Sequence, residues 1–228
     1  MANSVGDLFI VSTPIGNLED MTYRAVRVLK EVDIIAAEDT RKALILLNRY
    51  EIKDKKLTSH HVQNEHKTVD YLIREVLSGK KVALITEAGT PCVSDPGFLV
   101  VREAVRVGIR PIVIPGVSAL IFAVAACGLP VEKFSFYGFL PPKSGARRKI
   151  LEEISGSEKT AFVFESPYRV RRLLEEINDV MPECNIAVIR EATKFHEEVI
   201  RGTTKEVIQQ FGERDPRGEF VIAISSRH

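Results

Sequence analysis

The chain has 228 residues, 45% of them apolar and 28% charged, which is typical of a soluble globular protein with one large domain or two small ones. The net charge of +1 excludes a polycation, so any contact with nucleic acid must come from a local basic patch. The three cysteines lie far apart without a CxxC or Cys/His pairing, so neither a disulfide framework nor a metal site is expected.

The beginning of the chain lacks the basic and apolar segments of a signal peptide. Its most apolar stretch, residues 117–129, is too short to span a bilayer. We therefore expect a cytoplasmic protein without a membrane partner.

In the first half of the chain, short apolar runs alternate with stretches whose apolar residues recur at helical spacing. The runs predict buried parallel strands at 8–11, 34–37, 82–86 and 112–114. Helices are predicted around 25–32, 69–77 and 99–104. Gly79 and Gly108 follow the last two of these and are typical helix stops. This βαβ order predicts a parallel sheet covered by helices.

The second half begins with an almost wholly apolar helix over 118–127, which must be buried in the core or packed in a dimer interface. Strand patterns follow at 134–139, 160–164, 185–189, 197–201 and 220–224, with helices around 170–177 and 207–211. Two strands succeed each other directly near Ile189 and Val199, which favours a mixed or antiparallel sheet. We place the domain boundary at Pro115–Gly116, which gives α/β domains over 1–115 and 116–228.

Three turns rich in glycine and proline each follow a predicted strand, at 12–17, 87–97 and 115–119. Small-molecule sites in parallel sheets lie outside the carboxyl ends of the strands, so one shared pocket is expected if the three strands are neighbours. The dinucleotide and P-loop fingerprints are absent, and none of the turns holds a lysine or arginine. This favours an uncharged or cationic ligand, such as a nucleoside with an amino-acid tail. The alternative is that these are ordinary tight turns.

Several short motifs together carry a family resemblance. They read VSTPIGNL, AEDTR, AGTP, SDPG, PGVSA, GLP and GFLPPK, at 11–18, 37–41, 88–91, 94–97, 115–119, 128–130 and 138–143. Together they resemble the small-subunit ribosomal RNA methyltransferase I family, a branch of the tetrapyrrole methylase superfamily, and the match runs from Leu8 to Ile224. The resemblance implies two α/β domains of the tetrapyrrole methylase type, with S-adenosylmethionine (SAM) in the cleft between them. It also implies a homodimer and transfer of methyl to the ribose 2′-hydroxyl of a decoding-centre cytidine.

The resemblance assigns SAM contacts to the three turns and to one serine after a later strand. These residues are Pro14, Ile15, Gly16, Ala88, Gly89, Thr90, Pro91, Val93, Ser94, Asp95, Pro115, Gly116, Val117, Ser118, Ala119 and Ser166. One departure from the family is Glu87, which stands where the family usually has aspartate. Its extra methylene moves the carboxylate.

Polar residues follow the second predicted strand and the run at 57–59, and they supply catalytic candidates. Glu38, Asp39 and Arg41 come after the second strand and are interpreted as a cluster that faces RNA. The alternative is a capped helix start, with acids favoured in the first turn. Glu65 or His61 is a candidate proton acceptor, while Asn64 is a natural N-cap for the helix that follows. The sequence does not decide which group takes the proton.

A basic segment lies at 141–172, with eight lysines and arginines against four glutamates. Lys143, Arg147, Arg148 and Arg169 are its candidate RNA contacts, because salt-sensitive binding comes from lysine and arginine on phosphates. The alternative is a solvated helix face with charge pairs one turn apart.

The sequence therefore predicts a SAM-dependent methyltransferase that 2′-O-methylates a cytidine of small-subunit RNA, with SAM as methyl donor and without a metal. The first alternative is a tetrapyrrole C-methyltransferase, which would share the fold and the SAM turns. A second is a non-catalytic module that binds SAM or a nucleoside. The polar cluster at 38–41 and the basic segment favour RNA.

Overall fold

A computed structural model describes residues 5–212 and 216–226 of the chain. The chain divides into two compact units, Met1–Ser118 and Ala119–His228, so the division falls shortly after the predicted boundary at 115–116. None of the helices in the described part of the chain is long and apolar enough to cross a membrane.

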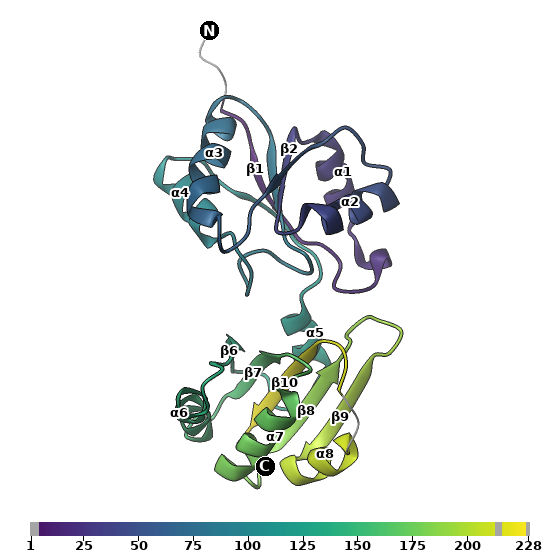
Figure 1. The fold of residues 1–228 in the computed structure, drawn as a ribbon, viewed down its shortest axis with the longest axis vertical. Coiled ribbons are helices and arrows are strands. Elements are labelled where there is room, and N and C mark those ends of the chain that lie inside the picture. The colour runs from purple at the N-terminus through teal and green to yellow at the C-terminus, as the bar shows by residue number, and fades with distance from the viewer. Residues whose placement is uncertain (1–4, 213–215, 227–228) are drawn as a thin grey trace. The chain divides into compact units, whose positions relative to one another are not determined.

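The first unit is a parallel five-stranded sheet between two layers of helices (Figure 1). Its strands are β1 (Leu8–Val11), β2 (Ile34–Ala37), β3 (Lys56–Ser59), β4 (Val82–Ile85) and β5 (Ile112–Ile114). Their order in the sheet is β3-β2-β4-β1-β5, and every neighbouring pair is parallel. The predicted parallel sheet is confirmed.

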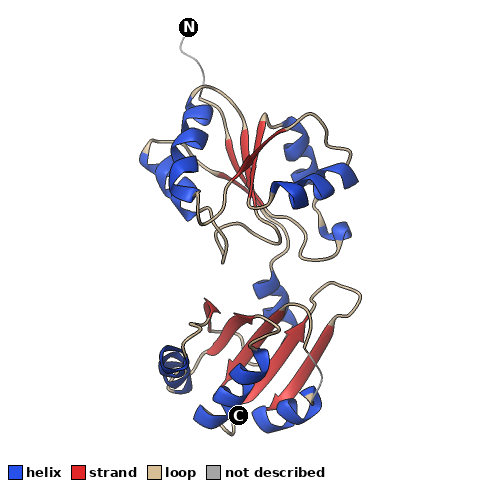
Figure 2. Ribbon diagram, viewed as in Figure 1, coloured by secondary structure: helices blue, strands red, loops and turns tan. Residues whose placement is uncertain are grey.

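The helices of the first unit cover the sheet in pairs. They are α1 (Tyr23–Glu31), α2 (Thr40–Arg49), α3 (Glu65–Leu77) and α4 (Phe98–Arg106), with a short 3-10 helix η1 (Leu18–Asp20). One apolar cluster joins α1 and α2 to one face of the sheet, and a second joins α3 and α4 to the other (Figure 2). The helices predicted at 69–77 and 99–104 end where expected, because Gly79 and Gly108 adopt positive φ angles of 95° and 81°.

The second unit is a mixed five-stranded sheet with the order β6-β7-β10-β8-β9. Its strands are β6 (Phe134–Phe139), β7 (Thr160–Glu165), β8 (Asn185–Arg190), β9 (Glu198–Thr203) and β10 (Phe220–Ser225). Only β6 and β7 run parallel, and Ile189 of β8 lies opposite Val199 of the antiparallel β9. The predicted mixed sheet is confirmed.

The main core of the second unit lies between its sheet and three helices, α6 (Ser144–Ser155), α7 (Val170–Val180) and α8 (Thr204–Phe211). The opposite face packs against α5 (Ala119–Ala126). The buried apolar cluster between α5 and the sheet contains Ala123 of the helix and Phe162 and Val221 of the sheet.

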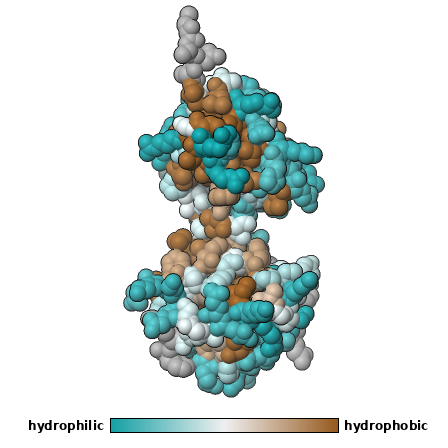
Figure 3. Space-filling view, turned by 90° about the vertical axis from the view of Figure 1, so that its left-hand side faces the viewer, coloured by the Kyte–Doolittle hydropathy of each residue, from teal (hydrophilic) through white to brown (hydrophobic). Residues whose placement is uncertain are grey.

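The apolar helix is only partly buried in the core, and the alternative that it packs in a dimer interface stays a prediction. Within α5 only Ala123 is buried, and Ile121 is 57% exposed. An isolated α-helix can turn only one side to a sheet, so a helix without a polar face leaves apolar side chains outside. Hydrophobic residues reach the surface of both units, as the brown areas of Figure 3 show.

Candidate functional site

The three glycine–proline turns leave three adjacent strands, β4, β1 and β5. Thr13 and Gly89 form an isolated antiparallel bridge, with N···O distances of 2.8 and 3.0 Å. The turn after β1 is also joined to β5, because the Ser12 amide donates to the Ile114 carbonyl at 3.2 Å. The condition for a shared site, that the three strands be neighbours, is therefore met.

Side chains connect the same turns to the third one. The Thr90 hydroxyl donates to the Val117 carbonyl at 3.2 Å, so its oxygen accepts from the Ser12 hydroxyl at 2.9 Å. Gly116 packs directly on Ser12, since a Cβ at Gly116 would lie 2.8 Å from the Ser12 Cβ. The turns form one hydrogen-bonded unit, in which glycine is needed for close backbone approach.

The residues predicted to contact SAM fall into a supporting set and an exposed set. The buried members are Pro14, Ile15, Gly89 and Pro91. Half-buried ones are Thr90, Asp95, Val117, Ser118, Ala119 and Ser166. The exposed members are Gly16, Ala88, Val93, Ser94, Pro115 and Gly116. Within the first unit, small exposed residues on a buried base leave backbone groups of the turns accessible.

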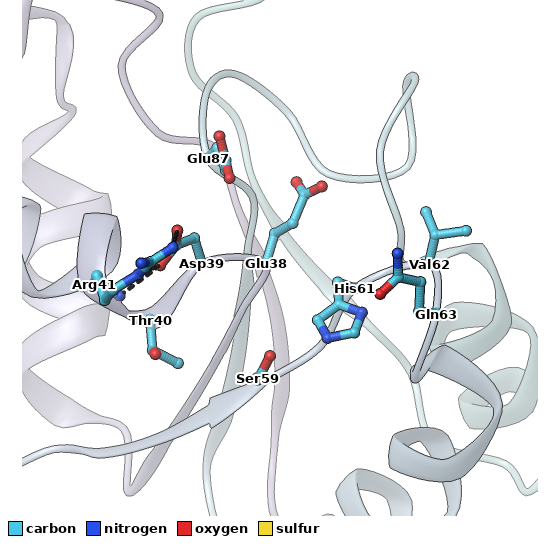
Figure 4. Close-up of a pocket in the computed structure, with 9 residues that line it drawn as sticks. All are labelled: Glu38, Asp39, Thr40, Arg41, Ser59, His61, Val62, Gln63 and Glu87. Carbon is cyan, nitrogen blue, oxygen red and sulfur yellow. Dashed lines mark hydrogen bonds and ion pairs between the residues drawn. The ribbon is translucent and has the colours of Figure 1, made fainter.

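An open cavity of about 570 Å³ lies at the carboxyl ends of β2, β3 and β4 (Figure 4). It is lined by Glu38, Asp39, Thr40, Arg41, Ser59, His61, Val62, Gln63 and Glu87. The structure thus brings together Glu38, Asp39 and Arg41 of the predicted catalytic set with His61. Glu65 is not among the lining residues.

Asp39 and Arg41 are held to each other on the wall of this cavity. The Asp39 carboxylate accepts from the Arg41 amide at 2.8 Å, from its Nε at 3.1 Å and from its Nη2 at 2.8 Å. Hydrogen bonds from the Arg41 side chain and amide lower the pKa of Asp39 to about 2. Asp39 also caps α2, so the capped helix start is confirmed, and the low pKa makes this carboxylate a weak proton acceptor.

Glu38 and Asp95 approach each other through Thr86, the residue that follows β4. The Thr86 hydroxyl donates to Glu38 Oε2 at 3.2 Å. Burial, and then the negative charge of Glu38, raise the pKa of Asp95 to about 6, a shift that the nearby Thr86 hydroxyl opposes. Asp95 is therefore a stronger proton acceptor than an ordinary carboxylate, a property that the sequence did not reveal. Only the order of the strands could have indicated it, because β2 and β4 are neighbours in the sheet and bring the residues that follow them together.

Glu87, the departure from the family pattern, forms an ion pair with Lys42 of α2. Its side chain lines the cavity and is partly exposed. The longer side chain is thus accommodated by a cation from the neighbouring helix.

The loop after β3 is held by Asn64 in an unexpected way. Asn64 occupies the N-cap position of α3 but makes no side-chain cap. Its amide group instead accepts from the His61 amide at 2.8 Å and donates to the Ser59 carbonyl at 3.0 Å. The prediction of a side-chain cap is wrong, because the Asn64 side chain folds back on the preceding turn.

The predicted RNA contacts of the second unit have different surroundings. Arg147 is 2% exposed and donates to Glu176 Oε1 at 2.7 Å and to the Pro141 and Pro142 carbonyls at 3.1 Å. The prediction that Arg147 contacts RNA is wrong, because a buried and paired guanidinium cannot reach a phosphate. Lys143 is exposed just before α6.

The other two arginines are paired but remain partly accessible. Arg148 forms an ion pair with Asp179. Arg169 donates from Nε to Glu165 Oε1 at 2.7 Å and reaches the Leu140 carbonyl at 3.3 Å. Ser166 follows β7, and its amide donates to the same glutamate oxygen at 2.7 Å. In the described ranges, no cluster of three or more His, Cys, Asp or Glu side chains could hold a metal ion.

Comparison with known proteins places this geometry in a family. The model of the tetrapyrrole (corrin/porphyrin) methylases matches residues 7–208. A protein of Thermotoga maritima named ribosomal RNA small subunit methyltransferase I is 43% identical over 223 residues, which are 98% of this chain and 100% of the relative. A protein of the same name from Halalkalibacterium halodurans is 42% identical over 219 residues, 96% of this chain and 75% of the relative.

A solved structure supports the fold. The uroporphyrin-III C-methyltransferase of Thermus thermophilus, in complex with S-adenyl homocysteine, gives a TM-score of 0.65 at 18% identity and covers 96% of this chain and 97% of its own. The predicted fold class, two α/β domains of the tetrapyrrole methylase type, is confirmed by this likeness and by the family match.

Proposed function

The chain belongs to the ribosomal RNA small subunit methyltransferase I family of the tetrapyrrole methylases, and on this premise we propose that it transfers a methyl group from SAM to small-subunit ribosomal RNA. The observation that carries the proposal is the hydrogen-bonded unit of three turns beyond β1, β4 and β5. The family relationship supports methyl transfer as the reaction class, and the turns are the proposed site of SAM.

SAM fits what these turns offer. It supplies a methyl group on a positively charged sulfur, and the turns contain no lysine or arginine to repel that charge. The exposed Gly116 would hold it through its backbone, because a glycine lets a ligand approach the main chain closely. Gly89 would shape the site instead, since its amide and carbonyl both pair with Thr13. A Cβ at Gly89 would lie 3.3 Å from the Ile15 side chain, so this backbone position has little room for a larger residue.

The acceptor in this proposal is the ribose 2′-hydroxyl of a cytidine. A hydroxyl is a poor nucleophile, and its oxygen must be aligned with the methyl group and lose its proton. Alignment contributes about 7–11 kcal/mol to such reactions, and a general base adds about 10²–10⁴-fold. We assign the proton to the Asp95 carboxylate, with Glu38 beside it, because a pKa of about 6 leaves Asp95 both ionised and basic at neutral pH.

The accessible cations of the second unit are the proposed contacts for RNA phosphates. Lys143 is exposed, while Arg148 and Arg169 keep their partners Asp179 and Glu165. We also propose that the protein is a cytoplasmic homodimer. The exposed apolar residues of α5, such as Ile121, support a partner surface.

Labelled methyl transfer tests the proposed reaction class. Purified protein and SAM labelled in the methyl group are incubated with small ribosomal subunits, large ribosomal subunits or uroporphyrinogen III. The proposal expects label only with the small subunit or its RNA. Label in uroporphyrinogen alone would replace it with a tetrapyrrole C-methyltransferase, and SAM binding without any transfer would favour a binding module.

A further inference from the structure

Glu65 connects two loops that are far apart in the sequence. It is the first residue of α3, after the loop that leaves β3. Its Oε1 accepts a hydrogen bond from the amide of Gly97 at 3.1 Å. Gly97 precedes α4 at the end of the turn that leaves β4. The carboxylate therefore holds the end of the turn predicted to contact SAM.

The contact on Gly97 is electrostatically favourable. Gly97 occupies the N-cap position of α4 and, as a glycine, has no side chain that could cap the helix. The Val101 amide donates to the Gly97 carbonyl at 3.0 Å, which begins the helix. A negative charge beside a helix N-terminus is stabilising, and here it comes from a different helix. The Glu65 carboxylate is thus already committed to a backbone donor.

The segment between Cys92 and Gly97 is compact and conformationally constrained. Cys92 has a φ angle of 71° and Gly97 one of 135°. A Cβ at Gly97 would lie 2.8 Å from both the Cys92 Sγ and the Leu84 Cδ2. The two ends of the segment therefore touch each other and rest on β4. A shift of Gly97 would move the whole segment.

Asp95 belongs to this constrained segment. It lies two positions before Gly97, and its carboxyl group is near Thr86 and Glu38, the residues that follow β4 and β2. These two residues are themselves joined, because the Thr86 hydroxyl donates to Glu38 Oε2 at 3.2 Å. Because the segment from 92 to 97 is short and closed, the anchor on Gly97 also fixes where the Asp95 carboxylate lies.

We propose that Glu65 is a positioning residue, which anchors the 92–97 segment through the Gly97 amide and so holds Asp95 beside Thr86 and Glu38. This inference rests on the proposed methyl transfer, and it replaces the interpretation of Glu65 as a proton acceptor. It requires a hydrogen-bond acceptor at position 65 but no titrating group there.

Two substitutions separate the roles. Glu65→Gln keeps an oxygen that can accept from the Gly97 amide but cannot take a proton, while Glu65→Ala removes the acceptor. Asp70→Ala is the matched control, because Asp70 is an exposed acid on the same helix. The two readouts are hydrogen exchange of the Gly97 amide without substrate, and kcat and KM for SAM in methyl transfer.

For Glu65→Ala we expect faster exchange at Gly97 and a loss in kcat/KM of about 100-fold, the cost of a displaced reacting group. For Glu65→Gln we expect the Gly97 amide to stay protected and kcat/KM to fall by at most about fivefold. This smaller loss reflects the missing negative charge at the N-terminus of α4. Asp70→Ala should match the wild type in both readouts.

The proposal is overturned if Gly97 exchanges equally in the wild type and Glu65→Ala, or if Glu65→Gln keeps the protection but is as inactive as the alanine variant. Should the alanine variant not fold, the activity of the glutamine variant alone decides. If the wild type transfers no methyl group, the proposed function fails, while the exchange at Gly97 still shows whether Glu65 anchors the segment.

Discussion

Thr13 and Gly89 exchange two backbone hydrogen bonds, at 2.8 and 3.0 Å, and so join the turn after β1 to the turn after β4. Main-chain bonds of this kind depend on backbone angles rather than on side chains. Gly89 meets the requirement with a φ angle of 82°, which residues with a Cβ rarely adopt. The stability of the site and the binding of SAM should therefore respond together to a change at Gly89.

Gly89→Ala should lower the free energy of unfolding by about 1–2 kcal/mol, because the alanine is forced to a positive φ angle. It should also weaken binding of S-adenosylhomocysteine, since its Cβ would press on Ile15 at 3.3 Å. Gly108→Ala is the control, with a φ angle of 81° but no atom within 4 Å of its Cβ. Chemical denaturation should find at least as large a loss of stability for Gly89→Ala as for Gly108→Ala, and calorimetry should find weaker binding only for Gly89→Ala. Equal binding by both variants would contradict the proposed role of Gly89 in shaping the SAM site.

Asp95 should make methyl transfer depend on pH. Its pKa is raised to about 6, so kcat/KM should fall as the pH drops below about 6 and the carboxylate becomes protonated. Asp95→Asn should be nearly inactive at every pH. A wild-type rate that stays constant from pH 8 to pH 5 would show that Asp95 is not the proton acceptor.

The same residue should weaken the fold at neutral pH. A carboxyl group whose pKa rises on folding lowers stability as the pH rises from about 4 to about 6, because the folded state disfavours its ionised form. Asp95→Asn should therefore raise the free energy of unfolding by about 1 kcal/mol at pH 8, a value reduced for partial solvent screening. The gain should vanish at pH 4, as urea titrations at the two pH values would test. A loss of stability at pH 8 would contradict this account.

Arg147→Ala should destabilise the second unit by up to about 3–5 kcal/mol, because it removes the buried partner of the Glu176 carboxylate and leaves it only Ser144 and the exposed Arg172. Arg148→Ala is the neighbouring control and should cost less than about 1 kcal/mol, since its pair with Asp179 is exposed. Arg147 lowers the pKa of Glu176 to about 2, so this contribution is present above the ordinary range of a glutamate and is lost as the pH falls towards 2. Similar losses for both arginines in chemical denaturation would be evidence against the buried pair.

Lys143→Ala should weaken binding to small-subunit RNA in a salt-dependent way. One lost phosphate contact makes the slope of log K against log salt less steep by about 0.7–0.9. Lys205→Ala on α8 serves as the control, because its ion pair with Glu183 is exposed and it lies outside the basic segment. Filter binding at several salt concentrations gives both slopes, and an unchanged slope for Lys143→Ala would remove it from the RNA contacts.

The strands and the three turns could be predicted because their signals are local. Short apolar runs define β1, β2, β4 and β5 of the first sheet, and glycines at positive φ define where α3 and α4 end. Even the pairing near Ile189 and Val199 was predictable, because no helical segment separates the two strands.

What could not be predicted depends on partners distant in sequence. In the sequence Arg147 resembles its more accessible neighbour Arg148. In the structure Arg147 is buried and pairs with Glu176 of the next helix. Likewise, Asp95 meets Glu38 because β4 lies beside β2 in the sheet, an order that differs from the order in the chain. The raised pKa of Asp95 follows from that neighbour and from burial, neither of which a local motif contains.

Nucleoside analysis of the RNA product tests the central claim most directly. Small subunits that lack their native modifications are incubated with the protein and SAM carrying a labelled methyl group, and the RNA is digested to nucleosides. The account predicts that the label is recovered as 2′-O-methylcytidine and is lost with Asp95→Asn. Label on a base, or on the ribose of another nucleoside, would contradict the proposed acceptor.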